Sequence, residues 1–392
     1  MLNEVFILSG VRTPIGTFGG TLAKTSPIEL GTLVTKEAIK RAKISPKQIE
    51  HVAFGHVINT EPKDMYLSRV VSLNSKISEE TPCFNVNRLC GSGAQAIVSM
   101  FQSIALRDAD FALAGGSENM SRSPFILNNS RWGKKMGNVL IEDMMLGALN
   151  CPFGTGHMGV TAENVAEKYN ISRREQDNFA LISQEKAAEA KNCGFFDDQI
   201  LPVEISTRKK TISFKNDEHL KITNFNELSK LLPVFKKNGT VTAGNSSGLN
   251  DGAASLVLAS QKSVVKNNLS PLARIIGYSH SGVNPEIMGI GPITAVEKLC
   301  KRFNLKINDF DVIESNEAFA AQACAVNKSL QFDTKKVNPQ GGAIALGHPI
   351  GATGAILVIK ALSELKRIKK KLALITMCIG GGQGIAIAIE KI

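Results

Sequence analysis

Short apolar runs alternate along the first third of the chain with longer segments in which apolar residues recur at helical spacing. The strand-length runs are VFILSG (residues 5–10), VAFGHVI (52–58) and FALAGG (111–116). Residues 28–42 and 94–106 have the helical pattern, so we expect them to form the helices between these strands. This alternation predicts an α/β fold with a mostly parallel sheet.

The last third of the chain repeats this plan. It predicts a strand at 311–316, a helix at 354–365 and another strand at 372–379. Two stretches also match in detail: CGSGAQAI, which starts at residue 90, and IGATGAI, which starts at residue 350, each precede a helix, a buried strand and a glycine-rich end. We infer two halves of related topology, with a site where the halves meet.

The segment between the halves has a different character. It contains few strand-like runs, a helical section near 161–190 and polar insertions, which are typical of a separate lid. We therefore expect three units: an N-terminal half (1–118 with 246–270), a lid (119–245) and a C-terminal half (271–392).

Residues 372–389 carry no charge and approach the length of a membrane span. Four glycines interrupt this segment near residue 381, and the apolar stretches on either side, LALITMCI and IAIAI, are strand-length and rich in branched residues. The sequence therefore predicts two buried strands around a glycine turn, and no membrane association.

The chain of 392 residues carries 46 Lys and Arg against 35 acidic residues, a formal charge of +11, and its 43% hydrophobic content excludes a disordered chain. Residues 205–237 hold eight basic and three acidic residues, so nearly half of the surplus lies in this part of the lid. The other basic residues are scattered, and Trp132 and three tyrosines offer few rings for base stacking. We therefore expect no nucleic-acid partner.

The seven cysteines occur at long, irregular intervals without a C-x-x-C pair, which argues against a disulfide framework and a zinc site. The first apolar run spans only residues 5–8 and follows an acidic residue, so it is too short for a signal-peptide core. We expect a reduced, cytoplasmic protein with no metal site and no signal or transit peptide.

Cys90 stands directly before a predicted helix whose first turns contain glycine, serine and alanine. A helix N-terminus favours the thiolate, and small neighbours let a substrate approach. A lone cysteine is more often a small buried hydrophobe, but the glycines on either side of Ser92 favour a functional thiol.

Three more candidates lie at glycine-rich turns or strand ends. His348 has five glycines within seven residues and could accept a thiol proton, although a buried structural histidine is the alternative. Cys378 ends a predicted strand before Gly380, and the N–H groups of such a turn can hold an oxyanion. Asn316 follows another strand, where it could position a water or equally cap the next helix.

These residues lie in motifs that resemble the thiolase family over essentially the whole chain. The motifs, in order, are VRTPIGTFGG, NRLCGSG, GHMGVTAENVA, GTVTAGNSSGLNDGAA, NEAFAAQ, GGAIALGHPIGATGA and MCIGGGQG. The resemblance implies two duplicated βαβαβαββ halves in α-β-α-β-α layers, with a lid that binds coenzyme A (CoA). His157-Met158 followed by glycine, together with Met288, most resembles the acetyl-CoA acetyltransferases.

For such an enzyme the resemblance implies a Claisen condensation of two acetyl-CoA molecules to acetoacetyl-CoA, and the reverse thiolysis. Cys90 would carry the acetyl group after His348 takes its proton, and Cys378 would remove an α-proton from the second acetyl-CoA. His348 with a water on Asn316 would form one oxyanion site, and the N–H groups of Cys90 and Gly380 the other. CoA enters as part of the substrate, so no separate cofactor is expected.

The resemblance also implies a set of residues along the acyl and pantetheine path: Leu149, His157, Met158, Lys221, Phe235, Ala243, Ser247, Leu249, Met288, Ala318 and Phe319. The lid departs from the family pattern near 220–228, where it is one residue shorter. Lys221 stands where many relatives have an arginine, and Glu227 where serine is common. A lysine is a point charge without bidentate geometry, which predicts weaker or rearranged phosphate contacts.

Several alternatives are compatible with parts of this pattern. A longer-chain 3-ketoacyl-CoA thiolase of fatty-acid degradation is the main one, and Met288 with His157-Met158 argues against it by narrowing the pocket. A condensing enzyme of fatty-acid synthesis would carry a second histidine, or an asparagine-histidine pair with the nucleophile, instead of Cys378. A lipid carrier on the same fold would not need all four catalytic motifs.

The resemblance further implies a tight dimer. The lid stretch 125–145 would join two dimers into a homotetramer through its apolar residues, which include Phe125, Ile126, Trp132 and Met136.

Overall fold

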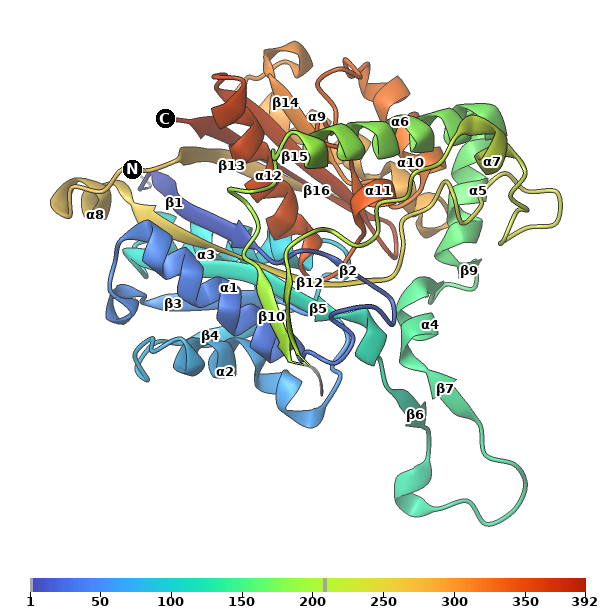
Figure 1. Cartoon of the computed structure of the whole chain (residues 1–392), viewed down its shortest axis with the longest axis horizontal. Helices are drawn as coiled ribbons and strands as arrows, with labels where there is room; N and C mark the ends of the chain where they lie inside the picture. Colours follow the sequence, from blue (N-terminus) through green and yellow to red (C-terminus); the bar gives the residue numbers. More distant parts are fainter. Residues whose placement is uncertain (1–2, 207–209) are drawn as a thin grey trace.

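The computed structural model describes residues 3–206 and 210–392, and one mixed sheet runs through both halves of the chain. The strands of the N-terminal half are β1 (Val5–Arg12), β2 (Gly16–Thr17), β3 (His51–Gly55), β4 (Cys83–Val86), β5 (Phe111–Asn119) and β12 (Asn250–Ser260). Those of the C-terminal half are β13 (Ala273–Gly282), β14 (Val312–Ser315), β15 (Leu372–Ile379) and β16 (Gln383–Lys391). The halves join where β1 pairs with β13, and they lie one above the other in Figure 1.

Helices form three layers, and the two halves of the sheet lie between them as two β layers. On the outer face of the N-terminal half lie α1 (Pro27–Ala42) and α2 (Leu67–Asn74), and on that of the C-terminal half α9 (Gly291–Phe303) and α10 (Ala320–Leu330). The helices α3 (Ser92–Ala105) and α12 (Thr353–Arg367) share one apolar core with the inner faces of both halves. The α-β-α-β-α layering implied by the resemblance is therefore confirmed.

The two central helices approach each other at their N-terminal ends. A Cβ atom on Gly93 would lie 2.9 Å from the backbone nitrogen of Ala355, and a Cβ atom on Gly354 would overlap the backbone of Ala94. Only glycine permits this approach. It brings the residues just before α3 and α12 to one place, which is the junction of the two halves.

The expected mostly parallel sheet is wrong. Among the strands of this sheet that the structure describes, only β3 with β4, β3 with β5 and β14 with β15 pair in parallel, whereas β12 and β16 return antiparallel beside the first strand of their half. All eleven residues of β12 are buried because helices cover both of its faces. A strand buried on both faces is apolar whichever way it runs, so its composition does not reveal its direction.

The predicted glycine turn near residue 381 is confirmed. The strands β15 and β16 pair antiparallel on either side of it, and both are almost wholly buried. Across residues 3–206 and 210–392, no helix combines the length and apolar character needed to cross a membrane.

The lid contributes the helices α4 (Met144–Leu149), α5 (Met158–Lys168), α6 (Arg173–Asn192) and α7 (Phe225–Ser229), and the strands β6 (Phe125–Leu127), β7 (Ile141–Asp143), β8 (Asn150–Cys151), β9 (Gly156–His157), β10 (Val203–Ser206) and β11 (Thr211–Phe214). Two short helices complete the fold: α8 (Gln261–Lys266) and α11 (Ala343–Leu346). The helices α5 and α6 lie over the C-terminal half, while the β6–β7 hairpin projects away from the body (Figure 1).

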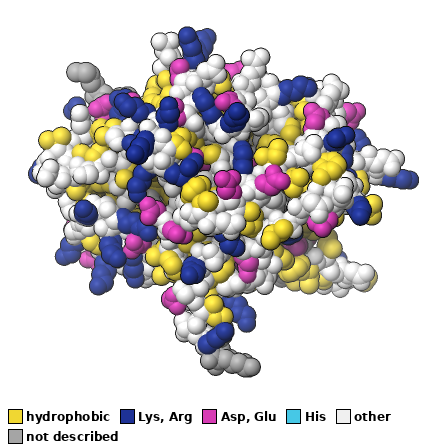
Figure 2. All heavy atoms as spheres, turned by 45° about the horizontal axis from the view of Figure 1, so that its top comes forward, with side chains coloured by type: hydrophobic (Ala, Val, Ile, Leu, Met, Phe, Trp, Pro, Cys, Tyr) yellow, Lys and Arg dark blue, Asp and Glu magenta, His cyan; other side chains and the backbone are white. Residues whose placement is uncertain are grey.

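The basic surplus does not form one continuous patch on the face drawn in Figure 2, where acidic side chains lie between the Lys and Arg side chains. Two of the eight basic residues counted in the lid, Arg208 and Lys209, lie outside the described residues.

Candidate active site

The two cysteines selected from the sequence meet at the junction of the halves. Cys90 lies two residues before α3, and Cys378 is the next-to-last residue of β15. The turn after Cys90 packs on the end of β15, because a Cβ atom on Gly91 would lie 2.5 Å from Ile379 Cδ1. The backbone N–H groups of Gly380 and of Cys90 itself are directed at the Cys90 thiol.

Both thiols are protonated near neutral pH. Burial raises the pKa of Cys90 to about 11, which outweighs the two N–H groups that lower it. Burial, and then the neighbouring Cys90, raise the pKa of Cys378 as well. The expectation that the helix N-terminus would favour the Cys90 thiolate is therefore wrong, because desolvation of the charged sulfur is the larger effect. A nearby base must take the proton when Cys90 reacts.

His348 is held as a neutral base. Its backbone N–H donates to Asn250 Oδ1 at 2.9 Å, and its Nδ1 lies 2.7 Å from Thr353 Oγ1. Because the Thr353 hydroxyl donates its one hydrogen to Pro349 O, it accepts from Nδ1–H. The Nε2 lone pair then faces Asn316, whose Nδ2 is 3.4 Å away. Burial lowers the His348 pKa to about 4, so the ring is uncharged at neutral pH.

Asn316 does not cap the following helix, which was the alternative reading of this residue. The helix α10 begins at Ala320, and its N-cap is Phe319. The Asn316 backbone N–H donates to Thr376 O at 3.0 Å, which ties the end of β14 to β15 next to Cys378. Its side-chain oxygen is buried and has no partner among the described residues, so it remains available to a substrate or a water.

One apolar cluster joins several of the residues expected along the acyl path to Cys378: Met158, Phe235, Met288, Ala318 and Phe319. At its side, the ring of His157 stacks on Phe235 with centroids 4.6 Å apart, and Phe235 meets Phe319 edge to face. This is an apolar wall with an imidazole at one side, which suits the arm of a thioester.

A second apolar cluster packs against Cys90, Leu149 and Leu249. Ser247 is tied to the first cluster, because its backbone N–H and its hydroxyl both donate to Ala318 O. Ala243 and Lys221 are exposed and belong to neither cluster. The structure thus gathers most of the expected set around the two thiols and leaves these two residues on the lid surface.

Three residues that contribute to the site were not selected from the sequence. Thr353 and Asn250 orient His348, as described above. The buried Glu118 carboxylate accepts from the backbone N–H groups of Val57, Ile58 and Gly351, and so joins the two halves beside the site. All three are polar residues inside glycine-rich or apolar motifs. In the sequence, this was the only feature that could have marked them as part of the site.

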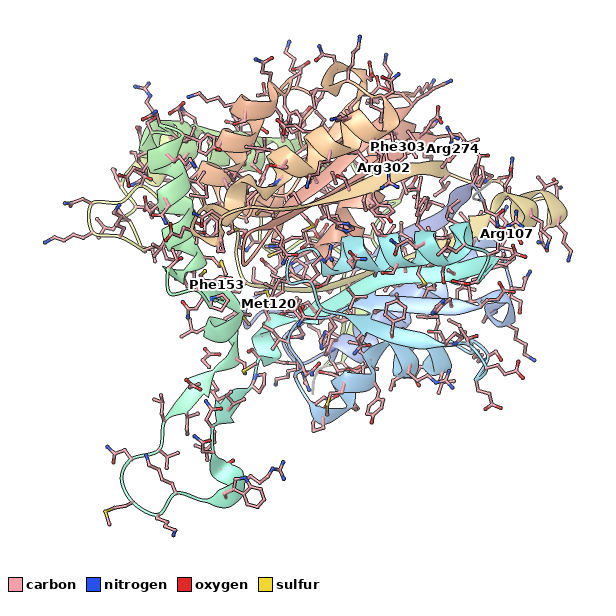
Figure 3. All side chains as sticks on the ribbon, turned by 180° about the vertical axis from the view of Figure 1, so that it is seen from behind. Arg107, Met120, Phe153, Arg274, Arg302 and Phe303 are labelled. Carbon is pink, nitrogen blue, oxygen red and sulfur yellow. The ribbon has the colours of Figure 1, made fainter. Side chains whose placement is uncertain are left out.

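Phe153 was also not selected. Its side chain is 69% exposed, and its ring lies 3.9 Å from the position of a Cβ atom on Gly381, in the glycine turn after Cys378. In Figure 3 it lies where the lid segment with α4 joins the body. In the described part of the chain, no three His, Cys, Asp or Glu side chains are grouped so that they could hold a metal ion.

Comparison with known proteins identifies the family of this chain. Residues 5–262 match the family model "Thiolase, N-terminal domain" and residues 269–391 match "Thiolase, C-terminal domain". The beta-ketothiolase BktB of Cupriavidus necator is 54% identical over 394 residues, and the acetyl-CoA acetyltransferase of Syntrophomonas wolfei is 44% identical over 397 residues, each with full coverage of both chains. The crystal structure of human mitochondrial 3-ketoacyl-CoA thiolase in complex with CoA is 43% identical, with a TM-score of 0.96, and covers 100% of this chain and 98% of its own. The chain belongs to the thiolase family.

Proposed function

We propose that this thiolase joins two acetyl-CoA molecules to form acetoacetyl-CoA and free CoA, and catalyses the reverse thiolysis. The observation that carries the proposal is the meeting of two protonated thiols and one neutral imidazole at the junction of the halves. A condensation of this kind needs one thiol to hold the acetyl group while a second group works as the base.

In the first half-reaction, His348 Nε2 takes the proton of Cys90 as the sulfur attacks the acetyl carbonyl. The N–H groups of Cys90 and Gly380, which already point at this sulfur, stabilise the oxyanion. The C–S bond to CoA then breaks, and the leaving CoA thiolate takes a proton from Cys378. The products are acetyl-Cys90, a Cys378 thiolate and a protonated His348, whose Nδ1–H remains bonded to Thr353.

In the second half-reaction, the Cys378 thiolate removes an α-proton from the second acetyl-CoA. The enolate oxygen is stabilised by Nε2–H of His348 and by a water bound to Asn316, whose unpartnered oxygen supports this role. The enolate carbon attacks acetyl-Cys90, the C–S bond breaks, and the Cys90 sulfur recovers its proton from His348. All three groups return to their starting states.

Two further proposals concern the substrate. Met158 and Met288 lie in the cluster that contains Cys378 and narrow the acyl path, which favours short chains. The resemblance to the human 3-ketoacyl-CoA thiolase favours the alternative of longer chains. Turnover of acetoacetyl-CoA against a 3-ketoacyl-CoA of about ten carbons separates them, and equal kcat/KM on both would refute the short-chain preference.

The lid supplies the remaining proposals. The exposed Lys221 would face the nucleotide phosphates of CoA. The β6–β7 hairpin carries large exposed apolar side chains, including Trp132 at 90% and Met136 at 88%, and these would be covered in a homotetramer. Sedimentation of the wild type and of Trp132→Ser tests this assembly, which requires the variant to dissociate into smaller species.

The chemistry is tested by mass spectrometry after incubation with acetyl-CoA. We expect an adduct of about 42 Da, one acetyl group, on the peptide that contains Cys90. A Cys90→Ser variant serves as the matched control and should stay unmodified on the same time scale, since its hydroxyl is a much weaker nucleophile. An unmodified Cys90 in the wild type under turnover conditions would refute the proposal.

A further inference from the structure

The lid helix α6 lies between the segment that carries Lys221 and the loop that leads to His348. We propose that Gln184 of this helix couples the two, so that engagement of the CoA nucleotide by the lid promotes catalysis. The inference rests on the proposed function, in which the nucleotide lies near Lys221 and His348 takes the proton of Cys90 during acyl transfer.

The side chain of Gln184 is 8% exposed and bonds in two directions. Its Oε1 accepts the backbone N–H of Lys221 at 3.0 Å, and its Nε2–H donates to Ile344 O at 3.3 Å. Ile344 belongs to α11, four residues before His348. The single side-chain amide of Gln184 therefore connects the backbone at Lys221, which is proposed to face the nucleotide, with the backbone of the histidine loop (residues 338–347).

The histidine loop is bonded so that a shift at Ile344 would reach the reacting groups. The Ile344 N–H donates to Glu317 Oε2 at 3.2 Å, and Glu317 directly follows Asn316 in the chain. The Asn338 side chain donates to the same carboxylate at 2.7 Å. Because buried, close-packed contacts transmit displacement, a change at Ile344 alters the 3.4 Å separation of Asn316 and His348.

The energetic reason is that binding energy from remote parts of a substrate can be used at the reacting centre. A substrate that lacks the nucleotide has no binding energy from the lid near Lys221, so the enzyme should turn it over with a lower kcat as well as bind it more weakly. If Gln184 carries this coupling, its loss should remove the advantage of the full substrate. One neutral hydrogen bond of this kind corresponds to a change of about 2- to 10-fold.

The neighbouring Ser183 offers a matched control. Its hydroxyl donates to Glu317 Oε2 at 2.7 Å and accepts from the N–H of Gly342 at 3.0 Å, so it supports the same loop. Among the described residues, the Ser183 side chain forms no hydrogen bond with Lys221. Removing it should weaken the loop for every substrate alike.

The experiment measures kcat for acetyl-CoA and for S-acetylpantetheine, which lacks the nucleotide, in the wild type, Gln184→Met and Ser183→Ala. Rates are normalised to the Cys90 that becomes acetylated, so that an unfolded fraction does not contribute. We expect the ratio of the two kcat values to exceed one in the wild type, to fall about 2- to 10-fold in Gln184→Met, and to stay unchanged in Ser183→Ala. Gln184→Ala should give the same shift if Gln184→Met folds poorly.

Three results would overturn the coupling: a wild-type ratio of one, a fall of both rates by the same factor in Gln184→Met, or a fall of the ratio in Ser183→Ala as large as that in Gln184→Met. Failure of the proposed function gives a different result, since wild-type Cys90 would then not be acetylated by either substrate.

Discussion

Replacing Thr353 by valine tests how the fold prepares His348. Valine keeps the branched shape of threonine but removes the hydroxyl that accepts Nδ1–H at 2.7 Å. Thr353 and His348 are almost completely buried, at 3% and 5% exposure, so bulk water cannot replace the lost acceptor. The variant therefore leaves a buried N–H without a partner or forces the ring to change its tautomer.

The magnitude follows from that unpaired group. A buried donor without a partner costs about 1–3 kcal/mol, which corresponds to about 5- to 150-fold in rate. The neutral ring avoids this cost by moving its hydrogen to Nε2, and Nε2 then has no lone pair for the Cys90 proton. We therefore expect slower acetylation of Cys90 with little change in the free energy of unfolding, because the neutral ring of the resting protein can relax.

The assay is a single-turnover measurement of Cys90 acetylation by rapid quenching and mass spectrometry. Thr353→Ser is the control, because it keeps the hydroxyl and should stay within a few-fold of the wild type. Acetylation by Thr353→Val within twofold of the wild type would refute the reasoning, and so would a serine variant as slow as the valine variant.

Three further predictions follow from the buried groups. In Cys378→Ala the leaving CoA thiolate must take its proton from water, so acetyl-Cys90 should still form; it should then accumulate while condensation slows by at least about 10²-fold, because the base of the second half-reaction is lost; condensation at the wild-type rate would contradict this role. Lys360→Met leaves Glu314, 2.7 Å from Lys360 Nζ in the folded protein, as a buried carboxyl without its ion pair, which should lower the free energy of unfolding by about 3–5 kcal/mol, measured with urea; an unchanged midpoint would contradict it. Burial lowers the pKa of three histidines to about 4: His219, His280 and His348. Between the ordinary pKa of about 6.5 and 4 the unfolded chain binds more protons at these three histidines, which lowers the free energy of unfolding as pH falls. Burial raises the pKa of Glu314 to about 7 and that of Asp251 to about 6, and these two carboxyls act in the opposite direction. The histidine contribution is therefore measured as the free energy of unfolding of the wild type minus that of His280→Gln, which should fall as pH is lowered through this range; a difference that stays constant or rises would refute the assignment.

Periodicity located part of the core helices and strands close to where they lie, and did not identify others, such as β13 and α9. The predicted helix at 354–365 is part of α12, and the predicted strand at 372–379 coincides with β15. Strand direction was not predictable in the same way, because β12 is buried along its whole length and its neighbours are set by contacts far away in the chain.

The candidate site shows the same division. Cys90, His348 and Cys378 could be selected because each is a chemically active residue beside glycines at the end of a regular element, which is a local feature. Thr353 and Gln184 could not, since their roles depend on partners that only folding brings near. The bond from Gln184 to Ile344, for example, spans 160 positions of the chain.

The sequence by itself indicated the alternation of helices and strands in parts of both halves, the relation between the halves, and which thiols and imidazole could react, because these depend on neighbours within a few residues. The tertiary structure alone decided the direction of the strands, the convergence of the two helix ends on one site, and the protonation of that site. Cys90 illustrates the reason: the local helix end favours a thiolate, but desolvation depends on every element packed around the sulfur, and it raises the pKa to about 11.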